Sequence, residues 1–289
     1  MAVKTIISAS RRTDIPAFYL PWFMTCLQKG CFRVVNPYNN RTKVVSAGPD
    51  QVHSIVFWSK NFGPFIEGEY GRRLEEMGYP LFFNFTINSA VPVLEPAMPP
   101  LENRLEQLSS LSRQWGARAV NWRFDPLCFF TSGDGNYQDN LGDFQEIAAA
   151  AFDAGIERCI TSFMDVYPKI KKRVQKMDGF MFYDPPIEKK IDILYQMQET
   201  LAPYKIALQM CCEGDLLAKL PDDLSIGASS CVPGRLLAEL YGDDLSLRKD
   251  AGQRVKAGCG CSVSVDIGSY KEHPCYHKCL YCYASPAEA

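Results

Sequence analysis

The sequence is poor in the features that identify several common functional classes. Its 289 residues include only three histidines, and none has the spacing of a hydrolytic zinc motif. The formal net charge is −2, so no bulk excess of positive charge attracts nucleic acid. No glycine-rich nucleotide motif, basic patch or aromatic stacking ladder stands out. A metal-dependent hydrolase is therefore the weakest candidate enzyme, and nucleic acid is a disfavoured but not excluded partner.

Long apolar segments are also missing. No run approaches the roughly 18–20 apolar residues of a membrane span. The apolar run within MAVKTIISASRRTD, at the N-terminus, is far too short for the core of a signal peptide. We therefore expect a cytoplasmic protein without a membrane partner. Disulfides are rare in that compartment, where clustered cysteines indicate metal or redox chemistry.

Cysteine, by contrast, is abundant, with 12 residues. Four are scattered among apolar residues, and we interpret these as small buried hydrophobes: Cys26, Cys31, Cys128 and Cys159. The other eight all lie from Cys211 onward. Packing alone does not account for such crowding in the last quarter of the chain.

Three of these cysteines lie in the stretch CYHKCLYCY, with the spacing C-x3-C-x2-C: Cys275, Cys279 and Cys282. One tight loop can point three such sulfurs at one centre, and three thiolates repel each other unless a metal neutralises them. A structural zinc site needs four ligands, and His273 or His277 could complete one. An iron–sulfur cluster takes cysteine thiolates. Alternatively, the fourth position stays open for a substrate, as in a catalytic metal site.

This motif, with Tyr281 just before its last cysteine, resembles the cluster loop of radical S-adenosylmethionine (SAM) enzymes. In that superfamily three cysteines hold a 4Fe–4S cluster, SAM chelates the fourth iron, and reduction cleaves SAM to a 5′-deoxyadenosyl radical. The superfamily carries the loop near its N-terminus, after the first barrel strand, whereas here it is C-terminal. From SASRRTDIPAFY to VDIGSY and the final cysteines, the chain resembles an uncharacterised bacterial and archaeal family noted for that displaced cluster.

Short apolar runs alternate with helical stretches along the chain. Strands are predicted at 5–10, 54–57, 81–87, 119–124, 158–163, 206–211, 224–228 and 262–267, with a hairpin at 32–45. Helices are predicted from residue 16 and at 65–77, 101–115, 138–154, 169–176, 188–201 and 234–241. The stretches 90–100 and 131–136 are predicted loops. This alternation favours an α/β fold, a single (β/α) TIM-barrel-like domain.

We expect residues 1–258 to form the barrel and the cysteine-rich residues 259–289 to pack on its mouth. If 262–267 is the last strand of a closed barrel, it lies beside the first strand. The cysteine loop then emerges at the mouth of the cavity. Such a fold is a circularly permuted radical SAM barrel.

Polar side chains follow several of the predicted strands, and in a barrel these strand ends converge on one cavity. The candidate catalytic residues are Arg11, Arg12, Asp14, Lys60, Arg123, Asp125 and Asp165, with Asn84, Thr86 and Glu213 at other strand ends. A buried Arg or Asp must be paired or bound to something. The arginines could hold a carboxylate or phosphate, or could pair with the aspartates in a structural network. The resemblance implies that SAM lies near Ser10, Arg11, Asp266 and Tyr281.

A second metal site is a further expectation. Cys259-Gly260-Cys261 suits a metal-gripping turn, and Cys211 with Cys231 would complete a four-thiolate set, in which the resemblance favours Cys211 over Cys212. However, a rising strand of ~5 residues at ~3.3 Å each would put Cys261 ~17 Å below its end, out of reach of Cys211. Either 262–267 is not a rising strand, or the set is wrong. The alternative is a pair of free or zinc-bound thiols.

The leading hypothesis is a 4Fe–4S radical SAM-type enzyme that acts on a small-molecule substrate and receives its electron from a ferredoxin or flavodoxin. The sequence does not identify the substrate. The alternative is a non-catalytic zinc- or iron–sulfur-binding module that recognises a partner through its C-terminal tail.

Overall fold

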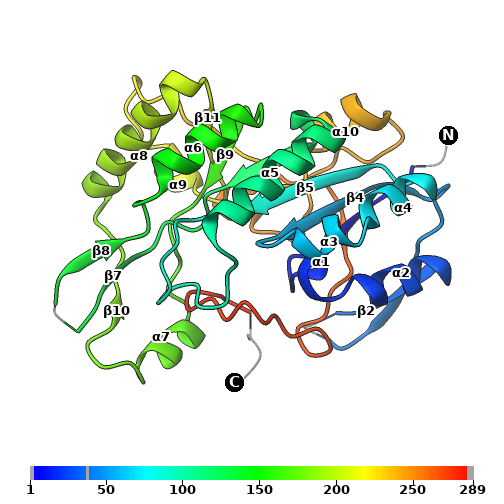
Figure 1. Ribbon diagram of the computed structural model, residues 1–289, viewed down its shortest axis with the longest axis horizontal. Helices are drawn as coiled ribbons and strands as arrows, with labels where there is room; N and C mark the ends of the chain where they lie inside the picture. Colours follow the sequence, from blue (N-terminus) through cyan, green and yellow to red (C-terminus); the bar gives the residue numbers. More distant parts are fainter. Residues whose placement is uncertain (1–2, 37–38, 134, 285–289) are drawn as a thin grey trace.

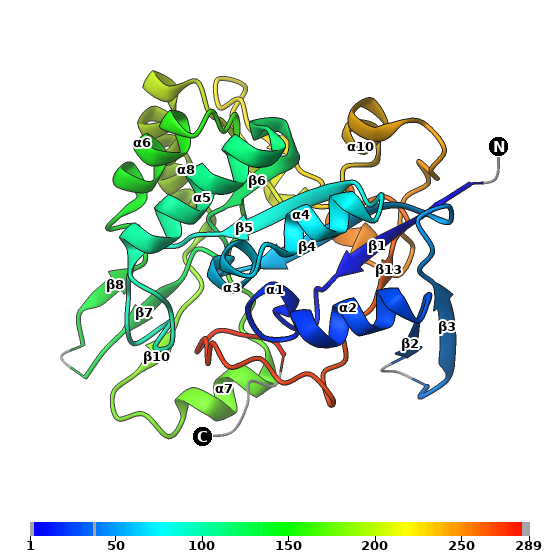
Figure 2. The ribbon, with the colours of Figure 1, turned by 45° about the vertical axis from the view of Figure 1, so that its right-hand side comes forward.

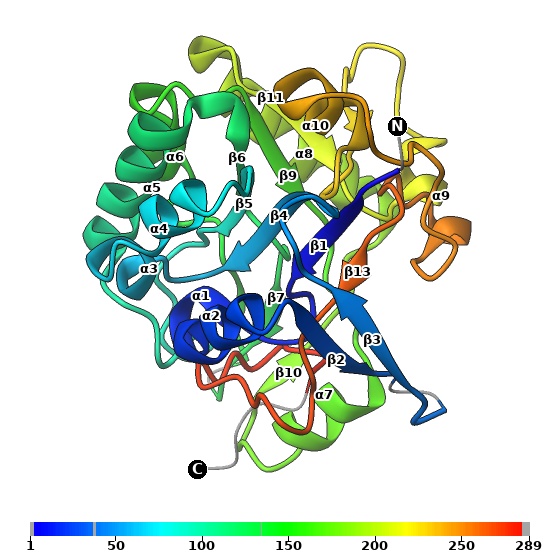
Figure 3. The same ribbon diagram turned by 90° about the vertical axis from the view of Figure 1, so that its right-hand side faces the viewer.

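A sheet of eight parallel strands forms the centre of the computed structural model, which describes residues 3–36, 39–133 and 135–284 (Figure 1). Its order is β12-β11-β9-β6-β5-β4-β1-β13, so the strands follow the chain except that β13 returns to pair with β1 (Figure 3). The strands are β1 (Thr5–Ala9), β4 (Val52–Ser59), β5 (Leu81–Thr86), β6 (Val120–Arg123), β9 (Arg158–Thr161), β11 (Ala207–Met210), β12 (Gly227–Ala228) and β13 (Val265–Asp266). Within the described ranges, β12 and β13 end the sheet.

Helices follow most of the strands. They are α1 (Ile15–Phe18), α2 (Leu20–Gln28), α3 (Gly63–Glu67), α4 (Tyr70–Glu76), α5 (Leu101–Trp115), α6 (Phe144–Asp153), α7 (Pro168–Val174), α8 (Ile187–Leu201), α9 (Gly214–Leu217) and α10 (Gly234–Tyr241). Buried residues at a spacing of three to four give α6 one apolar side, which includes Ile147, Ala148 and Ala151. Helices α5, α6 and α8 lie next to each other along one face of the sheet (Figure 1).

The two faces of the sheet differ because successive strand residues point to opposite sides. One face packs against the helices through large apolar side chains, among them Phe57, Phe83 and Trp122. The other face begins with a small apolar group, Ile6, Val56, Phe82 and Ile160, which packs against α10 and the residues around Cys231. One step further along the strands this second face becomes polar, with Ser8, Trp58, Asn84 and Arg123.

The first six predicted strands are all present, and so is the predicted hairpin, as β2 (Cys31–Val35) and β3 (Thr42–Ser46). Residues 37–38 of its connection lie outside the described residues. The helix predicted at 138–154 begins only at Phe144. The residues before it form β7 (Phe129–Thr131) and β8 (Tyr137–Asp139), an antiparallel pair that β10 (Met181–Phe182) extends. The glycine-rich stretch 131–136, of which residue 134 is outside the described ranges, connects this pair.

The strand predicted at 262–267 is mostly wrong. The Ser262 amide bonds to the Val232 carbonyl and the Val263 amide to the Arg248 carbonyl, so the chain crosses the face of the sheet before β13 begins. Cys261 therefore does not lie at the lower end of a rising strand. The predicted separation that would have kept Cys261 out of reach of Cys211 does not occur. The strand predicted at 224–228 is also shorter than predicted, since only the two residues of β12 form it.

The cysteine-rich C-terminal segment is part of the same α/β domain, because it supplies β13 to the sheet. Residues 285–289 of the predicted segment lie outside the described residues. Its last described part runs between α1 and α7, at the end of the sheet to which the β1 arrow points (Figures 2 and 3). No helix in the described part of the chain has the length and apolar character needed to cross a membrane.

Candidate functional site

The loop that carries Cys275, Cys279 and Cys282 is fixed to the ends of β1 and β4. Its main anchor is Asp14, which lies just after β1 and caps α1 by accepting from the Ala17 amide at 3.0 Å. The same carboxylate accepts from Ser59 Oγ at 2.8 Å and from the Lys60 amide at 2.8 Å. It also lies 2.7 Å from His277 Nε2, inside the cysteine loop. Asp14, which was predicted to be catalytic, therefore holds α1, the end of β4 and the cysteine loop together.

His277 and His273, the two candidate zinc ligands, have different surroundings. His277 is 3% exposed, packs on the Phe18 ring and has no hydrogen-bond partner for Nδ1 among the described residues. His273 lies between the Tyr19 and Trp22 rings, with centroids 4.8 and 4.1 Å away, and its burial lowers the pKa of its imidazole. Only His277 is therefore tied to a carboxylate in the manner of a metal-binding histidine.

A second anchor of the loop comes from α7. The Nη1 atom of Arg173 donates to the carbonyls of Cys279, Leu280 and Cys282 at 3.3, 2.5 and 3.1 Å. Its Nη2 atom reaches the Ala284 carbonyl at 3.4 Å. One guanidinium therefore holds four backbone carbonyls around the sulfurs. No sequence signal indicates this role, because the helical pattern of α7 does not identify the partner of Arg173.

The three sulfurs of this loop lie in a desolvated place. Burial raises the pKa of Cys275 to about 12, and burial also raises the pKa values of Cys279 and Cys282, which Lys60 opposes. Each of the three thiols is close enough to influence the ionisation of another. Backbone amides of Asp14 and His277 donate to Cys275. Thiolates here therefore require a bound cation, and the protein supplies amide donors for at least one of them.

A buried charged network lies beneath the loop. Lys60 Nζ is 2.7 Å from Glu95 Oε1, which also accepts from the Tyr281 hydroxyl and, at 2.9 Å, from Asn88 Nδ2. Lys60 also lies 5.4 Å from the centre of the Tyr281 ring. Burial opposes both charges, yet their attraction leaves the pKa of Glu95 below and that of Lys60 above its ordinary value. Lys60 and Tyr281 were predicted site residues, whereas Asn88 and Glu95 were not.

The four cysteines of the predicted second set do come together, and Cys212 joins them. Cys211 Sγ is 3.7 Å from Cys212 Sγ and 3.7 Å from Cys231 Sγ. Cys261 contacts both Cys231 and Cys259, and Cys259 contacts Cys212. The five thiols therefore form a closed ring of contacts, which we call the cysteine ring. It faces the polar half of the inner sheet surface, where Asn84 Nδ2 donates to the Cys231 carbonyl at 2.8 Å.

Two arginines adjoin the cysteine ring. Arg123 donates to Cys231 and also pairs with Asp125, and Arg11 donates to Cys261. The Trp58 ring lies between them, 5.0 Å from the Arg11 guanidinium and 5.4 Å from that of Arg123. Hydrogen bonds from neighbouring thiols, assisted by these cations, lower the pKa values of Cys211 and Cys261.

The residues expected around SAM are partly assembled. Asp266 accepts from Ser10 Oγ at 2.6 Å and from the Arg11 amide at 3.2 Å, and burial raises the pKa of this carboxyl. The Arg12 guanidinium donates to the carbonyls of Gly268 at 2.9 Å and Val35 at 3.1 Å, and its Nε atom lies 3.9 Å from the same Asp266 carboxylate. Ser10, Arg11 and Asp266 therefore form one group, while Tyr281 lies with Glu95.

The remaining predicted catalytic residues form ion pairs. Asp125 pairs with Arg123 and accepts from Ser162 Oγ at 2.5 Å, which realises the structural network weighed as an alternative. Asp165 is exposed and pairs with Arg254 at 2.6 Å. Glu213, at another strand end, accepts from the Phe163 amide at 2.9 Å. Asp165 is thus the one member of the catalytic set that stays at the surface.

The sulfur sites were tested for their fit to a metal. In residues 3–36, 39–133 and 135–284, no three His, Cys, Asp or Glu side chains are arranged to hold a single metal ion. The donor chemistry nevertheless fits an iron–sulfur group, because both sites offer soft thiol ligands and nearby cationic side chains. Lys60 and Arg173 are the cationic side chains at the C-terminal loop. Arg11 and Arg123 are the cationic side chains at the cysteine ring.

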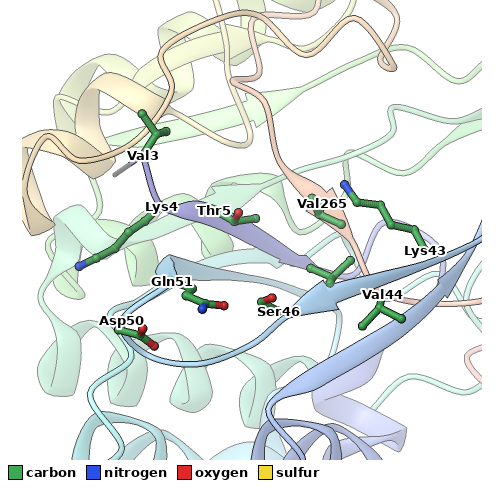
Figure 4. Close-up of a pocket in the computed structure, with 10 residues that line it drawn as sticks. Val3, Lys4, Thr5, Lys43, Val44, Ser46, Asp50, Gln51 and Val265 are labelled. Carbon is green, nitrogen blue, oxygen red and sulfur yellow. The ribbon is translucent and has the colours of Figure 1, made fainter. Parts of the chain in front are cut away.

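Two cavities lie beside the sheet, and neither of them contains a sulfur site. One of about 320 Å³ lies between the start of β1 and β3, next to Lys4, Thr5 and Lys43 (Figure 4). Another of about 430 Å³ is lined by Lys190 and Glu213. Neither is lined by a cysteine. We therefore locate the site by its chemistry, at the carboxyl ends of the strands, and not by the size of a hollow.

Comparisons with known proteins identify a family but no activity. No curated protein matches the chain. One solved structure is titled a sugar phosphate isomerase/epimerase from Parabacteroides distasonis; it shares 7% identity with a TM-score of 0.34, over 97% of this chain and 92% of the other. Residues 6–284 match the family described as "Domain of unknown function (DUF1848)". The match spans nearly the whole sequence, and the chain therefore belongs to the DUF1848 family.

Proposed function

We propose that this protein is a radical SAM-type enzyme whose 4Fe–4S cluster is held by Cys275, Cys279 and Cys282. When bound and reduced, that cluster supplies the electron that splits SAM into methionine and a 5′-deoxyadenosyl radical. The observation that carries the proposal is the fixed geometry of the loop. Asp14 and Arg173 hold the three sulfurs of the loop at the carboxyl ends of parallel strands, and Cys128, which packs beside them, belongs to another segment. The three cysteines of the loop by themselves leave one ligand position for a substrate.

The strand order supports a permuted barrel. Seven strands follow each other in chain order and β13 then returns beside β1, so the loop after β13 starts where a loop after a first strand would start. Closure between β12 and β13 is part of the proposal. Ser10, Arg11 and Asp266 are then the residues nearest to the origin of the loop, and they are the proposed contacts of SAM.

The protein groups around the loop have positioning tasks in this proposal. The buried Lys60–Glu95 pair and Tyr281 fill the space beneath the sulfurs and keep water from their protein side. Asp14 fixes the entry of the loop and Arg173 its exit. The remaining partners are a small-molecule substrate and an electron donor of the ferredoxin or flavodoxin type.

The test is anaerobic reconstitution of the whole chain with iron and sulfide. We expect bound iron and acid-labile sulfide, and formation of 5′-deoxyadenosine when dithionite and SAM are added. Cys279→Ser should abolish this product, whereas Cys26→Ser, a matched change at a half-buried cysteine outside the site, should not. Iron-loaded wild type that forms no more 5′-deoxyadenosine than Cys279→Ser would reject the activity.

One observation favours a second candidate, a zinc-binding module. His277 Nε2 is hydrogen-bonded to the Asp14 carboxylate, and its buried Nδ1 has no partner among the described residues. In many zinc sites a carboxylate orients a histidine in this manner, and the other ring nitrogen binds the metal. Three cysteines and His277 would close a four-coordinate site with no open position if the loop drew them together, since no three of them converge on one ion in the described chain. Metal analysis of the native protein distinguishes the two: one zinc per chain that disappears in His277→Ala supports the module, and iron retained in His277→Ala supports the cluster.

A further inference from the structure

We propose that the cysteine ring is the site of a second iron–sulfur cluster, bound through Cys211, Cys231, Cys259 and Cys261, with Cys212 outside the ligand set. This site uses none of the residues of the C-terminal loop. It therefore does not depend on SAM chemistry, and it can be tested in a chain that lacks the first site.

The fold assembles the ring from three separate segments. Cys211 and Cys212 follow β11, Cys231 follows β12, and Cys259 and Cys261 belong to the segment that crosses towards β13. All five are free thiols in the structure. The sequence alone thus places Cys211 beside Cys212 and Cys259 near Cys261. The tertiary structure brings these two pairs and Cys231 together.

Packing does not explain the surroundings of the ring. A cysteine that serves as a small hydrophobe lies among apolar neighbours, as Cys159 does in the main core. The cysteine ring instead adjoins two largely buried guanidinium groups, with Arg123 on Cys231 and Arg11 on Cys261. Cationic N–H donors aimed at sulfur stabilise thiolates, and a cluster with four thiolates carries net negative charge. The charge distribution therefore matches an anionic occupant.

The arrangement of the ring favours a cluster over a single ion. Two neighbouring sulfur pairs are 3.7 Å apart, a distance that two ligands of one zinc ion at about 2.3 Å could also have. Yet no three of these side chains in the described part of the chain are arranged to hold one ion. An iron–sulfur cluster distributes its thiolates over separate iron atoms, so its ligands need not converge on a single point.

Cys212 differs from the other four in position and charge. It directly follows Cys211 and has a left-handed backbone, with φ of 60°. Its cationic neighbour is Arg254, which is half-exposed and already paired with Asp165, whereas Arg11 and Arg123 face the opposite part of the ring. We therefore leave Cys212 out of the ligand set.

Glycines keep the C-x-C turn close to the other two segments. A Cβ on Gly260 would lie 2.9 Å from the Ser229 carbonyl oxygen. A Cβ on Gly258 would lie 3.1 Å from the Gly214 Cα atom, and Gly258 itself has a φ of +87°. The turn with Cys259 and Cys261 can thus approach the ends of β11 and β12 only because these positions lack side chains.

The test uses the full chain with Cys275, Cys279 and Cys282 all changed to Ser, reconstituted anaerobically with iron and sulfide. We expect it to retain about half of the wild-type iron and sulfide and a reduced-cluster EPR signal. Adding Cys231→Ser and Cys261→Ser should remove that remainder, whereas adding Cys212→Ser should leave it. Retention of no iron by the triple variant, or of zinc in its place, overturns the proposal, and so does loss of the cluster in Cys212→Ser but not in Cys211→Ser.

A second measurement covers the case in which the triple variant does not fold. Reduced wild type should contain two EPR-active clusters per chain by spin count, and a count of one overturns the proposal. Failure of SAM cleavage would leave both iron counts unchanged, so this inference and the proposed activity fail separately.

Discussion

Arg173 illustrates how much of the candidate site depends on single side chains. Its side chain donates to the carbonyls of both Cys279 and Cys282. Because these carbonyls belong to the backbone, any sequence in the loop could accept its hydrogen bonds. The specificity of the clamp therefore lies in the guanidinium, whose several N–H donors can serve several acceptors at once.

Removing this clamp should loosen the loop. For Arg173→Met we expect a loss of about 2 kcal/mol of unfolding free energy, since hydrogen bonds to a charged group are lost, and weaker retention of iron at the C-terminal site. Urea unfolding and iron analysis after gel filtration measure the two effects. Arg72→Met, which breaks only exposed pairs with Glu69 and Glu76, is the matched control and should change little. Equal behaviour of the two variants would contradict the role of Arg173.

The Lys60–Glu95 pair gives a second prediction at this scale. Glu95→Leu leaves the buried Lys60 ammonium without its partner and should cost about 3–5 kcal/mol, whereas Lys60→Met combined with Glu95→Leu should restore most of that loss. A double-mutant cycle by chemical unfolding measures the coupling. An additive double variant would show that the two side chains do not act as a pair.

Site residues could be predicted from the sequence where neighbouring residues in the chain indicated their role. The spacing of Cys275, Cys279 and Cys282 and the position of Asp14 after an apolar run were visible in the chain. Glu95 was not, because a proline-rich loop gives no indication of which strand end it covers. Arg173 was missed for a similar reason, since an Arg in a basic helical turn has the pattern of a solvated side chain.

At the scale of elements, the turn between Cys259 and Cys261 is the most constrained feature. Gly260→Ala should push this turn away from the Ser229 carbonyl, because a backbone atom has less room to yield than the end of a flexible side chain. We expect about 1–3 kcal/mol of destabilisation and a lower iron content at the cysteine ring. Gly227→Ala, where a Cβ meets nothing within 4 Å, is the control. Thermal unfolding and iron analysis of both variants decide whether the close approach matters.

The elements that the sequence misjudged share one property. Residues 262–264 alternate like a strand, but they bond to Val232 and Arg248 and not to a neighbouring strand of the sheet. Residues 138–143 were predicted as the first turns of a helix, yet Gln138 and Asp139 pair with Phe130 and Phe129 in an antiparallel sheet. Periodicity describes which side chains are buried and leaves the partner undetermined, so crossing segments and small sheets escape it.

For the whole molecule, stability and metal content should be linked. A ligand that binds only the folded chain stabilises it by about 2.7 kcal/mol at a hundredfold excess over its Kd. For a chain of this size that corresponds to a rise in Tm on the order of 5 °C. Anaerobic thermal unfolding of iron-loaded and metal-free protein measures it. Identical Tm values for the two forms would contradict a resident metal group at either site.

The overall architecture was predictable in its main lines, because alternating strands and helices leave few arrangements other than a parallel sheet with helices on its outside. The return of the last strand to β1 was also expected. The polar strand-end layer was also expected, but its partner was not, since only the strand register aligns Asn84 and Arg123 with the segment that carries the cysteine ring.

Arg11 belongs to both sulfur regions at once. Its guanidinium reaches Cys261 in the cysteine ring, and its carbonyl accepts from the hydroxyl of Tyr283, the neighbour of Cys282, at 2.5 Å. A change of charge in the cysteine ring or in the C-terminal loop therefore alters the interactions of Arg11, and through Arg11 it affects the other region. If each region holds a cluster, the first electron delivered should make the second harder to add, so the pair would titrate in two separate redox steps.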